Sequence, residues 1–202
     1  MGRTSDAREK LIEAARELMW ERGYADVGVQ ELCQRAGVRP GSFYYFFPSK
    51  ADLTVETLEA HWQAHEGQVL APARQIPDAL ERLRFVLQKT YEHHVTTRQS
   101  CGRAGGCPFG NLSGELMALD PAIREKLLEI FERHYTFYEQ LLTDAQAAGQ
   151  VSLDDGPVRA RALFAFLQGM QMLAHTHNDP EWIRLLAPDA FRLIGAPVPA
   201  FP

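Results

Sequence analysis

The stretch from Leu32 to Asp52 reads LCQRAGVRPGSFYYFFPSKAD and indicates how the amino-terminal part folds. An apolar-periodic run ends at Ala36, where a Gly-Val pair breaks it. A second, short helix should begin at Pro40, because the fixed φ of proline suits the first helical position. Phe43 and Phe47 are four residues apart and should face the interior together. Two short helices joined by a tight glycine-containing turn are typical of a helix-turn-helix, whose second helix enters the major groove of DNA.

A longer amphipathic helix precedes this motif. It is expected over residues 5–22, with Ser5 or Asp6 as N-cap, and Gly23 should end it. The first helix of the motif then covers residues 29–36. Its Cys33 occupies a position where a small apolar residue is expected, so we interpret this thiol as core packing.

These residues resemble the TetR/AcrR family of bacterial transcriptional regulators. The positions that match the family pattern are Ala36-Gly37-Val38, Gly41-Ser42-Phe43-Tyr44, Phe47-Pro48-Ser49-Lys50 and Leu53. The preceding helix fits the family as well. One departure is Gly28, where the family usually has Thr or Ser; glycine removes a hydroxyl that could contact a phosphate. The resemblance implies a DNA-binding domain over residues 1–50 and an effector-binding and dimerisation domain over residues 51–202.

The resemblance also implies roles for single residues. Tyr44 and Lys50 match positions that usually contact phosphates. The side chains at variable positions, which usually face base edges, are Arg39, Pro40, Ser42 and Tyr45. The forked donors of Arg39 suit the two major-groove acceptors of guanine. An alternative for the tyrosines and Phe46 is a small aromatic core that holds the domain together.

The charge distribution is compatible with a small DNA-binding domain on an acidic body. The whole chain has a net charge of −5, but residues 1–50 hold eight Lys/Arg and seven Asp/Glu, a net charge of +1. The acidic balance therefore lies in residues 51–202. No signal peptide and no run of eighteen apolar residues occurs, and three cysteines do not make a disulfide framework. These features predict a cytoplasmic protein with no membrane association.

The remainder of the chain should be helical throughout, because no strand-like alternation occurs. The expected helices are 50–70, 78–97, 108–119, 120–148, 154–177 and 180–194, which gives an all-α protein of about nine helices. The helices after residues 120 and 154 carry apolar residues on more than one face. We expect two copies to pair through the last two helices in a four-helix interface, as the family does, forming a homodimer with two DNA-reading units.

Cys107 is the second candidate site. It precedes Pro108, a helix-start signal, so its sulfur should lie near a helix N-terminus, where the helix dipole favours a thiolate. The segment 106–112 with Glu115 resembles a subgroup of the family that includes the N-ethylmaleimide-reductase repressor, in which the matching cysteine senses electrophiles or oxidants. Cys101 could resolve an oxidised Cys107. The alternative is that Cys107 is a small apolar plug at a tight junction.

A non-covalent effector would bind among the helices of the larger domain. The predicted lining residues are Tyr91, Tyr135, Tyr138, Phe166 and Met170, with His94 or His134 as polar anchors. Apolar walls with few polar groups suit a small aromatic or aliphatic ligand. Each of these residues could instead belong to the core. The histidines lack the spacing of a metal site, so neither a metal nor a cofactor is expected.

Together these observations predict a DNA-binding transcriptional regulator and no enzymatic activity. It should bind double-stranded operator DNA as a repressor and release it when a small apolar or electrophilic effector binds, or when Cys107 is oxidised. Two alternatives are a cysteine-dependent enzyme and a dimeric scaffold that does not read DNA. Salt-dependent binding to promoter DNA would separate the regulator from both.

Overall fold

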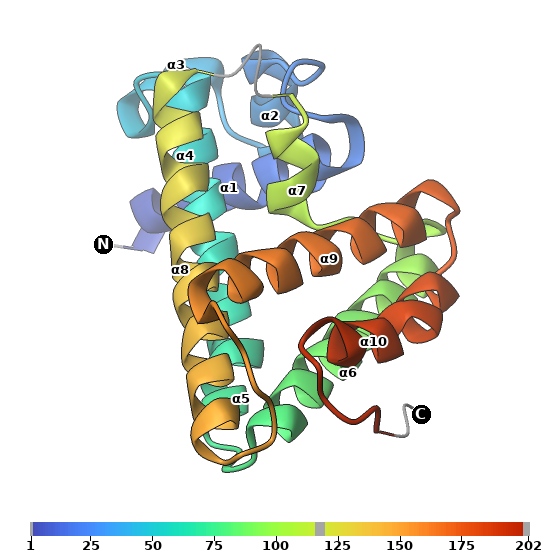
Figure 1. The fold of residues 1–202 in the computed structure, drawn as a ribbon. Helices are drawn as coiled ribbons and strands as arrows, with labels where there is room; N and C mark the ends of the chain where they lie inside the picture. Colours follow the sequence, from blue (N-terminus) through green and yellow to red (C-terminus); the bar gives the residue numbers. More distant parts are fainter. Residues whose placement is uncertain (1, 116–119, 200–202) are drawn as a thin grey trace. The chain divides into compact units, whose positions relative to one another are not determined.

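The computed structural model of the protein describes residues 2–115 and 120–199. These residues form helices, turns and loops, and no strand occurs among them, which confirms the all-α prediction. Figure 1 shows the helices in chain order. In the described residues no helix has both the length and the apolar character needed to cross a membrane.

Ten α-helices and one π-helical turn make up the described chain. They are α1 (Gly2–Arg22), α2 (Val29–Ala36), α3 (Pro40–Phe46), α4 (Lys50–His65), the π-helical turn (Glu66–Leu70), α5 (Ala71–Arg74), α6 (Ala79–Cys101), α7 (Pro108–Ser113), α8 (Pro121–Ala147), α9 (Gly156–Thr176) and α10 (Glu181–Leu193).

Several helix ends differ from the sequence expectation. The helix expected over 50–70 leaves α-geometry at Glu66 and continues as a π-helical turn into α5. Pro72 supplies a physical reason, because proline removes a backbone N–H and disturbs the turn before it. The helix expected to end at 97 continues to Cys101, where Gly102 adopts a left-handed φ of 76°. The helix from Pro108 ends at Ser113, and residues 116–119 of its expected range lie outside the described residues.

The chain divides into two compact units. Unit 1 comprises Met1–Ala64 and Pro108–Ile130, and unit 2 comprises His65–Cys107 and Phe131–Pro202. The predicted boundary at residue 50 lies within unit 1, because α4 and the segment from Pro108 cluster with the helix-turn-helix. Helix α8 contributes its first part to unit 1 and its second part to unit 2.

Unit 1 holds the three amino-terminal helices around one apolar core. Its fully or nearly buried members are Leu11, Ala14, Ala15, Met19, Val27, Leu32, Cys33, Phe43, Phe47 and Leu53. Burying a leucine or phenylalanine side chain stabilises a fold by about 1.5–3 kcal/mol, so this short segment has a substantial core. Cys33 is 1% exposed and burial raises the pKa of its thiol, which agrees with a packing role.

Unit 2 is built on α6, α9, α10 and the second part of α8. Its buried apolar residues include Leu83, Leu87, Leu141, Leu142, Leu163, Leu167, Ile183 and Phe191. The start of α6 is held by Arg82, which forms an ion pair with Asp144 of α8 and donates a hydrogen bond from Nε to the Ile76 carbonyl (2.6 Å). Asp78 caps α6 by accepting from the Glu81 N–H.

Candidate nucleic-acid interface and effector site

The turn between α2 and α3 has the geometry of a helix-turn-helix. Gly37 ends α2 with a left-handed φ of 64°, which glycine adopts without strain. Arg39 is the N-cap of α3 with extended backbone, and Pro40 is its first residue, as predicted. Phe43 and Phe47 are buried, 0% and 2% exposed, so they anchor the short helix to the core.

The opposite side of α3 faces solvent. Tyr44 and Tyr45 are 62% and 76% exposed, which argues against the small aromatic core considered for them. Phe46 is half-buried, and Tyr45 packs on its ring edge-to-face, with centroids 4.9 Å apart. The phenol groups of both tyrosines are therefore available to an external partner.

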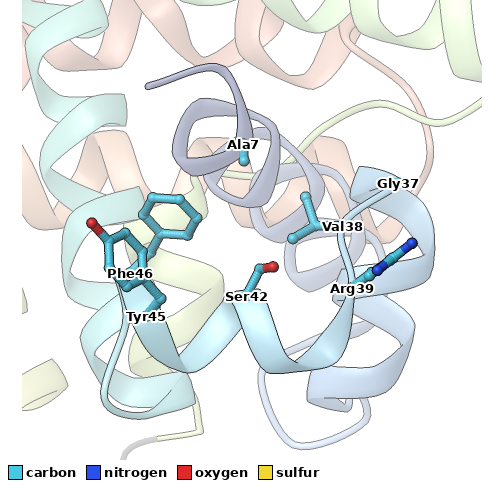
Figure 2. A pocket seen from close by; sticks show the side chains of 7 residues that line it. All are labelled: Ala7, Gly37, Val38, Arg39, Ser42, Tyr45 and Phe46. Atoms are coloured by element: carbon cyan, nitrogen blue, oxygen red, sulfur yellow. The ribbon is translucent and has the colours of Figure 1, made fainter. Parts of the chain in front are cut away.

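A hollow of about 370 Å³ lies between α3 and the amino-terminal part of α1. Figure 2 shows its lining residues, which are Ala7, Gly37, Val38, Arg39, Ser42, Tyr45 and Phe46. Three of the residues predicted to face base edges, Arg39, Ser42 and Tyr45, thus share one concave surface. Pro40 is exposed at the start of the same helix.

Arg39 differs from the other cations of this part of the chain. Five arginine or lysine side chains form ion pairs, which are Arg8–Glu56, Lys10–Asp6, Arg16–Glu13, Arg22–Glu31 and Arg35–Glu17. Lys50 donates to backbone carbonyls. Among the side chains described between residues 6 and 64, Arg39 is the cation without an intramolecular partner. Its guanidinium is exposed and keeps all its donors for a ligand.

Lys50 lies at the first position of α4 but points to the protein itself. Its Nζ donates to the carbonyls of Tyr24 (2.9 Å) and Val27 (3.0 Å) and lies 3.9 Å from the Tyr24 ring centroid. Burial lowers the pKa of Lys50, and the nearby charge of Glu115 opposes that shift. Two of its three donors are therefore used inside unit 1. Contact with a phosphate, which the sequence predicted, would rest on the third.

In unit 2, part of the predicted pocket gathers around one ring. Phe164 of α9 contacts aromatic side chains of α8, with centroid distances of 4.9 Å to His134, 5.3 Å to Tyr135 and 6.3 Å to Tyr138. His134 also lies 5.5 Å from the His65 ring. We call this group the Phe164 cluster. Tyr138 is buried, and burial together with the nearby Cys107 raises the pKa of its phenol.

His94 of α6 is buried and has one unsatisfied nitrogen. Its Nδ1 lies 2.8 Å from the Thr90 carbonyl, so Nδ1 carries the hydrogen and donates, while Nε2 is left as a buried acceptor without a partner. Burial lowers the pKa of His94 to about 4, so the ring is neutral at pH 7. Met170 is buried on α9 and Phe166 is half-buried there.

Tyr91 belongs to a different feature of unit 2. Its hydroxyl donates to Glu181 Oε1 (2.6 Å). It lines an open hollow of about 410 Å³ together with Val95, Arg98, Gln99, Asp179, Pro180 and Glu181. No other predicted pocket residue lines this hollow, so the structure places Tyr91 apart from the Phe164 cluster.

Cys107 ends a loop that is firmly held within unit 2. The Asn178 side chain accepts from the Ala104 N–H (2.7 Å) and donates to the Gly102 carbonyl (3.2 Å). His175 Nδ1 donates to the Ala104 carbonyl (2.8 Å). Cys107 itself is 9% exposed, and Pro108 begins α7 directly after it, as predicted. Cys101 is exposed at the end of α6, and its thiol donates to the Thr97 carbonyl.

Comparison with known proteins decides what this arrangement is. The family described as bacterial regulatory proteins, tetR family, matches residues 11–57, and the tetracyclin repressor-like C-terminal domain matches residues 79–187. The chain belongs to the TetR family. As a TetR-family protein it is a DNA-binding transcriptional regulator, with α2 and α3 as its helix-turn-helix and a helical carboxy-terminal domain.

Individual relatives agree with this assignment over most of the chain. The transcriptional regulator AcuR of Cereibacter sphaeroides is 35% identical over 184 residues, covering 87% of this chain and 79% of AcuR. The repressor NemR of Escherichia coli is 32% identical over 124 residues, covering 60% of each chain. The crystal structure of a TetR regulatory protein from Rhodobacter sphaeroides superposes with a TM-score of 0.81 at 30% identity, covering 93% of this chain and 98% of that one.

The sequence did not predict the structural roles of several residues that hold turns and loops in place. Glu115 accepts hydrogen bonds from the Tyr24 and Ala25 N–H groups, both 3.1 Å long. In unit 2, His175 and Asn178 hold the loop before Cys107, and no sequence pattern predicts this role for them. These hydrogen bonds join residues about 70 to 90 positions apart in the sequence, so no local sequence pattern predicts them. For Asn178 the structure offers one local sign, a left-handed φ of 52°.

Proposed function

We propose that this protein is a homodimeric repressor that binds operator DNA through α3 and releases it when an effector acts on unit 2. The observation that supports it best is the free Arg39 guanidinium on the same concave surface as Ser42 and Tyr45. The bases would be read by Arg39, Pro40, Ser42 and Tyr45, whereas Tyr44 and Lys50 would contact phosphates. Because its proposed operator lies on bacterial DNA, we propose that the protein is cytoplasmic.

Exposed apolar side chains support a homodimer. Val158 and Met172 of α9 are 61% and 59% exposed, and they lie about four helical turns apart on the same face. Leu185 of α10 is 64% exposed. Large exposed apolar residues on the last two helices are expected where a second copy packs, and α9 and α10 are the helices that the sequence predicted for this contact.

The effector side of the proposal has two forms. A non-covalent ligand would be apolar or aromatic and would bind beside the Phe164 cluster, whose histidine and tyrosines supply polar groups to orient it. A covalent effector would be an electrophile that adds to the Cys107 thiolate, or an oxidant such as hypochlorite that converts it to a sulfenic acid. Either can release DNA only by favouring a conformation with lower operator affinity.

The membership of the TetR family favours a regulator over a cysteine-dependent enzyme or a scaffold. The DNA-binding part is tested by selecting duplexes from a random library and measuring their affinity by fluorescence anisotropy at several salt concentrations. A specific site bound by two protomers, with an affinity that falls steeply with salt, is expected. A monomer with no preference over random sequence would contradict the proposal.

The thiol part is tested by adding N-ethylmaleimide, to whose double bond the Cys107 thiolate adds. Wild type and Cys101→Ser should lose affinity for the selected duplex, whereas Cys107→Ser should retain it. Cys101→Ser is the matched control because it removes an exposed thiol by the same substitution. Equal loss of affinity in the wild type and in Cys107→Ser would remove Cys107 from the mechanism.

A further inference from the structure

The turn that connects α1 to α2, residues 23–28, is held from two sides by charged groups of unit 1. The Glu115 carboxylate accepts from the N–H groups of Tyr24 and Ala25. The Lys50 ammonium donates to the carbonyls of Tyr24 and Val27. The backbone of Tyr24 therefore lies between an anion bound at its N–H and a cation bound at its carbonyl.

The backbone of the turn is shaped for the approach of this carboxylate. Gly23 has a φ of 91°, which side-chain-bearing residues rarely adopt. A Cβ atom at this position would lie only 2.6 Å from Glu115 Oε1. Glycine is thus favoured at this residue by its conformation, and a larger side chain would also displace the Glu115 carboxylate from the Tyr24 and Ala25 N–H groups.

The two charged residues connect this turn to other helices of unit 1. Lys50 begins α4, four residues after the last residue of α3. Glu115 follows α7, which contacts α1. Hydrogen bonds to a charged partner are stronger than neutral ones, and two that are accepted by one carboxylate fix both distance and direction. Displacing the turn would shift α2, and with it α3, relative to α1.

We propose that Glu115 is a positioning residue for operator binding, which holds the α1–α2 turn so that α3 meets the bases in register. This inference rests on the proposed function, since it presumes that α3 reads DNA. The carboxylate is not proposed to touch DNA; it acts through the turn. Its removal should therefore affect the reading of a specific site and leave non-specific attraction to phosphates intact.

The test compares Glu115→Gln with Glu125→Gln. Both remove one negative charge from unit 1, and Glu125 is an exposed residue of α8 whose side chain has no partner among the described residues. The probe is a duplex selected from a random library by the wild type, with a scrambled duplex of equal length. Glu115→Gln should bind the selected duplex roughly tenfold more weakly, as expected for losing one charge-assisted contact, and the scrambled duplex unchanged.

Amide hydrogen exchange supplies a second measurement. The Tyr24 and Ala25 amides should exchange faster in Glu115→Gln than in Glu125→Gln, while the amides of α9 exchange at equal rates. Equal affinity of the two variants for the selected duplex would overturn the inference. Loss of affinity for both duplexes in parallel with a lower melting temperature would overturn it as well. A wild type that does not distinguish the duplexes overturns the proposed function and the inference together, whereas an unaffected variant beside a selective wild type overturns only the inference.

Discussion

The helix-turn-helix and the Phe164 cluster use aromatic and polar residues in opposite ways. On α3 the residues with a predicted function are exposed, except Ser42, which is half-buried, and buried Phe43 and Phe47 only support them. In unit 2 the predicted effector residues are themselves packed, as His134 and Tyr138 are against Phe164. On α3, therefore, the predicted DNA contacts and the core packing belong to different side chains. In the Phe164 cluster the same side chains would have to serve both. Mutations should divide along this line.

The largest effect is expected from Phe164→Ala. This change removes the ring that contacts His134, Tyr135 and Tyr138, and truncation of a buried phenylalanine destabilises a protein by about 3–5 kcal/mol. Thermal unfolding followed by circular dichroism measures it, with Phe85→Ala, a half-buried phenylalanine of α6, as the control. The base preference of any protein that remains folded should not change. A loss below about 1 kcal/mol would show that neighbouring side chains relax into the space that the ring leaves, and that the cluster is not rigidly packed.

The second effect is a pH dependence that comes from His94. Its folded pKa is about 4 and its ordinary value is 6.5, so between these values the unfolded chain binds a proton that the folded protein does not. The free energy of unfolding therefore decreases as the pH falls from 6.5 to 4, by up to about 3 kcal/mol from this group. His94→Asn should lose that part of the slope in urea denaturation measured across the window. Burial also lowers the pKa of His65, which remains in the variant, so part of the pH dependence should persist. If the plots of unfolding free energy against pH are parallel for wild type and His94→Asn, His94 contributes nothing to the slope.

The third prediction separates two roles of Lys50. If the main role of Lys50 is to donate to the Tyr24 and Val27 carbonyls, Lys50→Met should lower the stability of unit 1 by about 2–3 kcal/mol. The reason is that two partly buried hydrogen bonds from a charged donor are lost. If it chiefly contacts phosphate, stability should change little and the salt dependence of DNA binding should decrease by about one unit of slope. Arg16→Met is the control for loss of an exposed cation of unit 1, which pairs with Glu13 and lies over the Trp20 ring.

The smallest effect on folding, and the most specific one on DNA, is expected from Arg39→Ala. The side chain is exposed and has no intramolecular partner among the described residues of unit 1. The free energy of unfolding should therefore stay within about 0.5 kcal/mol of the wild-type value. Discrimination against the wrong base at one operator position should fall by about 1–3 kcal/mol. Arg124→Ala, another exposed arginine of unit 1 without an intramolecular partner among the described residues, should change neither quantity. Unchanged base preference in Arg39→Ala would remove it from the reading set.

The sequence predicted the helix-turn-helix well because the residues that define its helix ends and its buried face are close together in the chain. Pro40 at a helix start, Gly37 at a helix end and the Phe43–Phe47 pair each act within one turn of helix, and each was found where expected. The sequence also located the start of α7 at Pro108, and it placed the starts of α6 and α9 close to where they lie, at Ala79 and Gly156.

What could not be predicted depends on contacts across the chain. The family resemblance implies that Lys50 contacts a phosphate, and no local pattern predicts that it also donates to the carbonyls of Tyr24 and Val27. The aromatic residues of α8 and α9 were correctly expected to be apolar and mostly buried, yet the sequence could not divide them between core and pocket. Whether such a residue belongs to the core or lines a pocket depends on the volumes of the side chains around it. The helical periodicity of apolar residues carries no information on those volumes.

The isolation of Arg39 from the rest of the molecule has an evolutionary consequence. Since no intramolecular bond depends on this guanidinium, a gene duplicate can replace it without weakening the scaffold. New target preferences can then arise by drift at a single codon while the buried core of unit 1 is inherited unchanged. Divergence of regulatory circuits would in this way begin at an exposed residue of unit 1 and reach buried positions only later.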